Sequence, residues 1–151
     1  MRFAPLRQTR IAFDESGRLF VSAHIWTGEQ HATGILRQEA DGTFARIAGE
    51  AWGSTDEGVA ATSAQLELAA LGFDAAGDLW VAEGPSNIVR RIDMTDGNIY
   101  TMAGNRGATG DGGDYGPAAG ARCNLPSDIV AHPDGHIVFA DSYNYAVRMI
   151  W

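Results

Sequence analysis

The sequence has little of three things: cysteine, basic side chains and long apolar runs. Its 151 residues include one cysteine, Cys123, which excludes an internal disulfide and a cysteine-clustered zinc site. Eleven Lys and Arg residues against nineteen Asp and Glu give a formal net charge of −8, which argues against a surface that gathers nucleic acid or anionic lipid. No apolar run approaches the roughly 20 residues that span a bilayer, and the N-terminal residues lack the apolar core of a signal peptide. We therefore expect a soluble chain that binds neither nucleic acid nor membrane, in a compartment that the sequence does not identify.

The composition is that of a folded, turn-rich domain. Apolar residues make up 45% of the chain and charged residues 20%, while glycine is abundant at 19 residues. From Gly104 to Ile150, short runs of β-branched and aromatic residues alternate with Gly, Pro, Asp and Asn. This alternation indicates strands joined by tight turns rather than helices.

The chain contains an internal repeat. Phe13–Ala23, Phe73–Glu83 and Ala131–Asp141 superpose without a gap, and their turn glycines coincide. The last two copies stay in register through the next run, which places Arg90 over Arg148. A second motif, RIAG at 46–49, returns as TMAG at 101–104. A repeat of this length and strand content predicts stacked β units.

The third copy carries the most specific motifs. It reads GDGG at 110–113, NLPSDIV at 124–130, PDG at 133–135, VFADS at 138–142 and NYAVRMI at 144–150. In these residues the chain resembles the NHL-repeat family of β-propellers, and the resemblance extends over nearly the whole chain. The middle copy departs modestly, with Glu83 in place of Asp141, and the first copy has seven extra residues between its second and third strands. The resemblance implies an all-β fold of four-stranded antiparallel blades, but it does not by itself imply a function.

Three blades are expected in one propeller segment that covers residues 1–151. Blade 1 occupies about 8–49, blade 2 about 66–104 and blade 3 about 124–151, and the last blade lacks its outer strand. Short helical turns are expected within Val59–Leu66 and Ala118–Arg122. The expected strands are Ile11–Phe13, Arg18–Ser22, Gly34–Gln38, Thr43–Ala48, Ala69–Phe73, Asp78–Ala82, Ile88–Ile92, Ile99–Ala103, Asp128–Ala131, His136–Ala140 and Ala146–Ile150.

Three blades make a half-ring, whereas propellers protect their sheets by closing the ring. An open arc exposes the apolar faces of its first and last blades and one unpaired strand edge. We therefore expect a protein partner, either a second copy that closes the ring as a two-fold dimer or further blades of a longer chain.

Two loops have residues of metal-ligand types, but each has a simpler interpretation. The Asp111–Asp114 loop offers two carboxylates of the kind that Ca²⁺ prefers, but a glycine turn explains it more simply. His24, Glu29 and His31 are zinc-ligand types in the inserted loop at 24–34, but their spacing matches no zinc motif. No cofactor and no metal are therefore expected.

The recurring acid–arginine pairs are the most regular polar feature. Glu83 with Arg90, and Asp141 with Arg148, are expected to form structural ion pairs at matching points of two blades. The two acids are also candidates to line an axial opening and bind a polar ligand. Phe20, Trp80 and Val138 share one repeat column and are expected in the core, as is Cys123.

The remaining binding candidates are aromatic or histidine side chains. His24 and Trp26 are expected at the rim of a pocket, because inserted loops on repeat scaffolds often carry function. Tyr143 and Tyr145 lie in a turn, where aromatic side chains make good interface anchors.

No nucleophile motif occurs, so no catalytic residue is assigned. The favoured function is a non-enzymatic binding or scaffold module that mediates protein association. The alternative is a propeller-type lyase, hydrolase or lactonase in which acids and histidines from several blades hold an axial metal.

Overall fold

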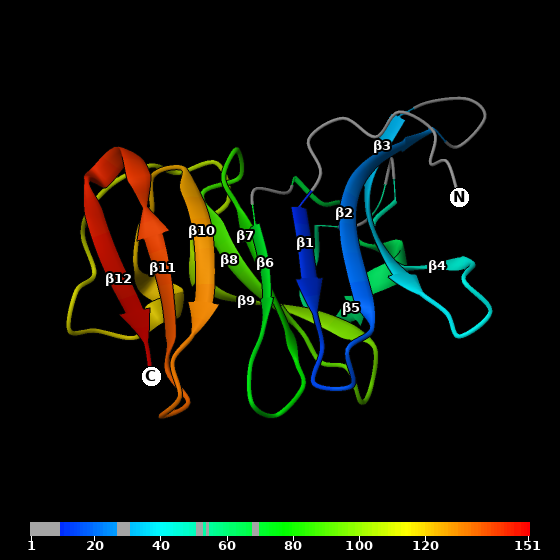
Figure 1. Cartoon of the computed structure of the whole chain (residues 1–151). Coiled ribbons are helices and arrows are strands. Elements are labelled where there is room, and N and C mark those ends of the chain that lie inside the picture. Colours follow the sequence, from blue (N-terminus) through cyan, green and yellow to red (C-terminus); the bar gives the residue numbers. More distant parts are fainter. Residues whose placement is uncertain (1–9, 27–30, 51–52, 54, 68–69) are drawn as a thin grey trace.

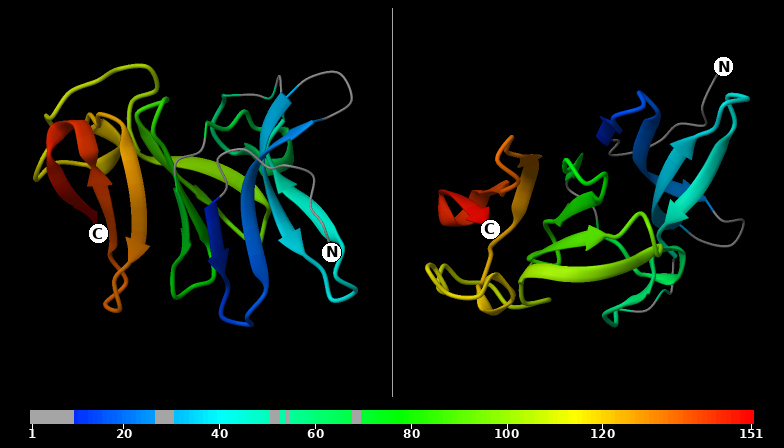
Figure 2. Two further views of the ribbon diagram at one scale, coloured as in Figure 1. Left: turned by 45° about the horizontal axis from the view of Figure 1, so that its top comes forward. Right: turned by 90° about the horizontal axis from the view of Figure 1, so that it is seen from below.

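A computed structural model describes residues 10–26, 31–50, 53, 55–67 and 70–151, without the side chains of Ile25, Trp26 and His31. The described residues form three antiparallel sheets that stand side by side in chain order (Figure 1). The innermost strand of the second sheet, β6 (Ala70–Phe73), contacts the first strands of the other two sheets, β1 (Arg10–Phe13) and β10 (Pro126–Ala131). From below, the sheets diverge from these strands as blades around an arc (Figure 2).

The first and third sheets are meanders of consecutive strands, and the second is a meander with β5 (Val59–Ala60) added beside its last strand. The first sheet has the order β1, β2 (Leu19–Trp26), β3 (His31–Gln38) and β4 (Phe44–Ala48). The second continues from β6 through β7 (Leu79–Glu83), β8 (Ile88–Ile92) and β9 (Asn98–Gly104) to β5 at its outer edge. The third has β10, β11 (Ile137–Asp141) and β12 (Ala146–Ile150). Short 3-10 helices occur at η1 (Ala61–Ser63), η2 (Ala118–Gly120) and η3 (Ser142–Asn144).

The predicted strands are observed, with two differences. Within the expected loop at 24–34, His24–Trp26 and His31–Gly34 instead lengthen β2 and β3, because cross-strand pairing continues to Trp26 opposite His31, while residues 27–30 lie outside the described part of the chain. The second sheet also gains β5, which pairs with β9, so only part of the expected helical turn at 59–66 is helical.

The RIAG and TMAG motifs lie at the ends of β4 and β9. Steric contacts explain why both motifs finish with glycine. Gly49 and Gly104 have φ values of 94° and 88°. A Cβ on Gly49 would lie 2.1 Å from the Thr33 carbonyl oxygen, and one on Gly104 would lie 2.2 Å from that of Asn87. Only glycine lets the fourth strand approach the start of the third so closely.

Two apolar clusters lie between neighbouring sheets. One contains Phe20 of the first sheet with Leu79 and Val81 of the second, and the other contains Trp80 of the second with Phe139 of the third. Phe20 and Trp80 are therefore core residues, as the repeat column predicts. Val138, in the same column, is only partly buried, because no fourth sheet lies beyond it in the part of the chain described.

The outward faces of the two end sheets have exposed apolar side chains on β1, β10 and β12. On β1, Ala12 packs against the core, whereas Ile11 and Phe13 are 62% and 60% exposed. On the last sheet Val130 is 60% and Val147 76% exposed. Among the described residues, no helix has the length and apolar character needed to cross a membrane.

Candidate functional site

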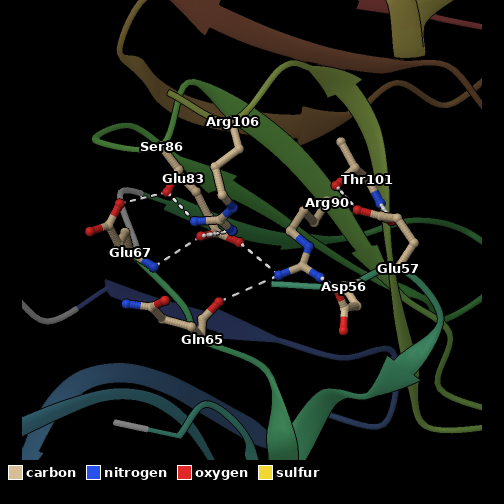
Figure 3. A network of polar contacts seen from close by, with 9 residues as sticks. All are labelled: Asp56, Glu57, Gln65, Glu67, Glu83, Ser86, Arg90, Thr101 and Arg106. Carbon is tan, nitrogen blue, oxygen red and sulfur yellow. Dashed lines mark hydrogen bonds and ion pairs between the residues drawn. The ribbon is translucent and has the colours of Figure 1, made fainter. Parts of the chain in front are cut away.

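The most deeply buried charges lie at the end of β7 and in the middle of β8. The side chains of Glu83 and Arg90 are fully buried, and Glu83 Oε1 lies 3.5 Å from Arg90 Nη1 (Figure 3). Arg90 also donates to the backbone carbonyls of Gln65 and Asp56, each at 3.4 Å. Its guanidinium therefore ties the loop before β6 to the sheet.

Three further side chains complete this network. The Glu83 carboxylate accepts a hydrogen bond from the Glu67 amide at 3.0 Å and one from Arg106 Nη2 at 3.2 Å. Ser86 bridges Arg106 and the Glu67 carboxylate (Figure 3). Glu67 and Arg106 lie in connectors outside the superposed repeat segments, so the sequence did not predict their roles. Ser86 lies over Asn144 of the third copy, but its part in the network was not predicted either.

Burial dominates the electrostatics of the pair. It raises the pKa of Glu83, although Arg106 and Arg90 oppose the shift. It also lowers the pKa of Arg90, against the attraction of Glu83 and Glu57. Among the residues that the structure describes, Glu83 Oε1 and Arg90 Nε have no hydrogen-bond partner. The pair is therefore an ion pair with incomplete hydrogen bonding, which makes it costly to break.

The third sheet repeats this arrangement in a more open setting. Asp141 is fully buried and accepts hydrogen bonds from the Asn124 amide at 2.6 Å, Asn144 Nδ2 at 2.8 Å and Arg148 Nη1 at 3.2 Å. The Arg148 side chain is 11% exposed and also pairs with Asp114 at 2.8 Å. Both predicted ion pairs are thus present, each within its own sheet, and Glu83 and Asp141 are bound by separate sets of partners.

Cys123 lies in the core beside this second network. It is fully buried, and burial followed by the nearby Asp141 charge raises its pKa to about 11. A buried thiol that stays protonated is a small apolar residue, as expected.

The other predicted binding residues lie apart from these networks. His24, on β2, is half-buried, and its Nδ1 lies 3.3 Å from Thr33 Oγ1 on β3. The Trp26 side chain lies outside the described part of the structure. Tyr143 and Tyr145 are 66% and 98% exposed at the turn between β11 and β12. The binding roles of these four residues remain predictions.

The residues of the candidate calcium loop at 111–114 make other contacts in the described structure. Asp114 pairs with Arg148, and the Gly112 carbonyl accepts a hydrogen bond from the Arg122 amide at 2.9 Å. Of the zinc candidates, Glu29 and the His31 side chain lie outside the description. No group of three His, Cys, Asp or Glu residues suited to a metal occurs in the portion of the chain described.

A cavity of about 640 Å³ lies at the outer edge of the third sheet. Its lining includes β12 on one side and the segment 113–118 on the other, with Phe139 and Ala121 among its apolar residues. Sequence analysis predicted an unpaired edge here but not a cavity, because the cavity depends on how the loop folds back beside β12.

The comparisons with known proteins agree with this architecture. No protein-family model matches the chain. Teneurin-m of Drosophila melanogaster is 30% identical over 132 residues, a match that covers 77% of this chain and 5% of teneurin-m. Among solved structures, a protein of unknown function from Bacteroides thetaiotaomicron has a TM-score of 0.69 at 16% identity, over 93% of this chain and 46% of that one.

Two further structures have names that mention a function. An auxiliary nutrient binding protein from Bacteroides thetaiotaomicron has a TM-score of 0.66 at 18% identity, and virginiamycin B lyase from Staphylococcus aureus has 0.58 at 17%. Each match covers 95% of this chain and 37% of the other. At these identities the likeness concerns the fold alone. The three sheets match part of a β-propeller, and the sequence is similar to a small part of teneurin-m.

Proposed function

We propose that the chain is a non-enzymatic, NHL-type propeller module that mediates protein association and closes its ring by pairing with a second copy. The observation that carries this proposal is the pair of apolar end faces. Ile11 and Phe13 on the first sheet, and Val130 and Val147 on the last, are exposed at positions of the kind that form the core between inner sheets. Exposed apolar surface of this kind marks association sites.

The acidic side chains support a structural rather than a catalytic role. Glu83 and Asp141 are the two acids that an axial metal site would use, and each is bound to arginine and backbone amides of its own region. The network of Arg90, Glu67, Ser86 and Arg106 around Glu83 thus stabilises the blade.

The solution mass tests the proposal. Light scattering on a sizing column, over a concentration series, should give twice the 16.1 kDa chain mass. A monomer that stays folded and monodisperse throughout the series would overturn the self-association model.

A double variant with one lysine on each end face, Ile11→Lys with Val130→Lys, should shift the mass to the monomer. Lysine at these exposed sites leaves the buried clusters intact but places charge in the proposed interface. Ala75→Lys with Thr95→Lys adds the same charge at exposed turns of the middle sheet and should leave the mass unchanged. Equal masses for the two double variants would count against the end faces.

A further inference from the structure

The cavity beside β12 occupies the place where the second sheet has its fourth strand. In the second sheet β9 pairs with β8 on one side and with β5 on the other. In the third sheet β12 pairs with β11, and no other described strand reaches its outer edge. The cavity lies along that edge.

The loop that covers β9 shows how a strand is held there. The Gly58 amide donates to the Ile99 carbonyl at 2.9 Å, and the Ala61 amide donates to the Gly97 carbonyl at 2.8 Å. The Glu57 carboxylate accepts hydrogen bonds from both the amide and the hydroxyl of Thr101 (Figure 3). A strand in this position is therefore held along both edges.

The segment Asp114–Ala118 has backbone angles similar to those of Glu57–Ala61 at two corresponding positions. Tyr115 has a φ of 63° where Gly58 has 69°. Pro117 has φ and ψ of −59° and 128° before η2, and Ala60 has −55° and 129° before η1.

The chemistry of the two segments also corresponds. Asp114 stands where Glu57 stands, and it lines the cavity. Pro117 has no amide hydrogen, but the two amides that hold β9 correspond to Tyr115 and Ala118, which both have one.

The apolar residues of the cavity correspond to those around Ile99 of β9. Ile99 is fully buried in the first cluster, together with Ala48, Ala61, Ala64, Val81 and Ile92. The equivalent residues in the next repeat are Ala103, Ala118, Ala121, Phe139 and Ile150, and all five line the cavity. The cavity therefore has apolar residues suited to one side chain of the size of isoleucine.

We propose that the slot between β12 and Asp114–Ala118 binds an extended peptide strand with the pattern of β9. The strand adds to the sheet by backbone hydrogen bonds, and its side chains give specificity. An isoleucine fills the apolar cavity, a threonine two residues later donates to Asp114, and a following alanine and glycine fit beside the start of β12. The slot shares Val147 with the end face of the last sheet, but Ile11, Phe13 and Val130 do not line it, so different variants can test the two proposals.

Peptide binding tests the slot directly. A fluorescein-labelled peptide GNIYTMAGN, which repeats residues 97–105, should bind saturably with one peptide per chain in fluorescence anisotropy. Hydrogen exchange should slow at residues 114–118 and 146–150 in the complex. A peptide with Thr101→Pro loses the amide and hydroxyl and should bind at least tenfold more weakly.

Matched protein variants locate the contact. Asp114→Ala should weaken peptide binding by roughly two- to tenfold, the usual range for one lost hydrogen bond. Asp111→Ala removes an exposed carboxylate of the same loop that does not line the slot, and it should leave the affinity unchanged.

Two results would overturn the slot: no saturable binding at millimolar protein, or binding that protects other strands and is indifferent to Thr101→Pro and Asp114→Ala. The assay repeated on Ile11→Lys with Val130→Lys separates the two proposals. Binding that persists in this variant supports the slot whatever the solution mass shows, whereas a dimer that binds no peptide supports the end faces alone.

Discussion

The second and third sheets contain the same acid–arginine pair in two different settings. The side chains of Glu83 and Arg90 are fully buried, and Arg90 lies on the strand that pairs with β9 and contacts the loop that covers β9. Asp141 is equally buried, but Arg148 stays partly exposed at an edge with no described neighbour. The fourth strand, rather than the pair itself, thus decides how far the arginine is removed from water.

This difference shows how one sequence motif can have two energetic roles. In the second sheet the Glu67 amide and Arg106 both donate to Glu83 Oε2, so Arg90 is the one described charge beside Oε1. In the third sheet each Asp141 oxygen has a donor besides Arg148, namely the Asn124 amide for Oδ1 and Asn144 for Oδ2. The loss of Arg148 therefore leaves Asp141 partly satisfied.

The largest expected effect breaks this comparison directly. Arg90→Ala should lower the free energy of unfolding by about 3–5 kcal/mol, because it leaves a buried carboxylate with less compensation. Arg148→Ala should cost about 1–2 kcal/mol, since Asp141 keeps its other donors. Denaturant unfolding of both variants measures the difference, and equal losses would show that β9 does not set it.

The pH dependence of Arg90→Ala sharpens the same test. Burial already raises the pKa of Glu83 above its unfolded value, so the folded state prefers the protonated carboxyl. The free-energy cost of Arg90→Ala is therefore largest at pH values above the folded pKa, where Glu83 is ionised. The deficit relative to the unmodified chain should therefore shrink as the pH falls toward the ordinary carboxyl pKa near 4.5. Glu83→Gln in the Arg90→Ala background should recover part of the loss at pH 7.

A smaller effect is expected in the apolar column shared by the two sheets. Trp80→Ala should cost about 3 kcal/mol or more, because Trp80 lies in the cluster between the second and third sheets and its Nε1 donates to Asp74 at 2.7 Å. Val138→Ala, in the same column on the open face, should cost less than about 1 kcal/mol in the monomer. Thermal unfolding of both variants at low concentration measures this contrast, which similar losses would contradict.

The smallest expected effect concerns Asp14, in the turn between β1 and β2. Burial works to raise the pKa of Asp14, but hydrogen bonds from Ser16 and Arg18 and the Arg18 charge outweigh it and lower the pKa to about 2. A lowered carboxyl pKa stabilises the fold above the unfolded pKa near 3.8, and this contribution disappears as the pH falls through about 2. Asp14→Asn should lower the melting temperature by a few degrees at pH 7 and leave it unchanged near pH 2.

Glu15→Gln removes an exposed carboxylate from the same turn and provides the control for that prediction. It should leave the melting temperature nearly unchanged at both pH values. An Asp14→Asn deficit that persists at pH 2 would mean that shape, and not charge, is what Asp14 contributes.

Local signals in the sequence predicted much of the fold. The strands Ile88–Ile92 and Ala146–Ile150 match their predicted bounds, because β-branched runs between Gly, Asp and Asn define strand ends locally. The extension of β2 to Trp26 and of β3 back to His31 was not predicted, since the Gly, Glu and His residues of this stretch are usual in loops. Arg106 and Glu67 were missed for a related reason, because they meet Glu83 from connectors that have no repeat signal.

The sequence by itself determined the repeat, the strand pattern, the acid–arginine pairs and the apolar columns, because each depends on residue type at a fixed spacing. The tertiary structure decided which members of a column are buried, since that depends on whether another sheet lies beyond. It placed Trp80 in the core and Val138 on an open face, and it formed the slot between β12 and Asp114–Ala118. Burial and cavities arise from the stacking of whole sheets, and spacing along one strand does not contain that information.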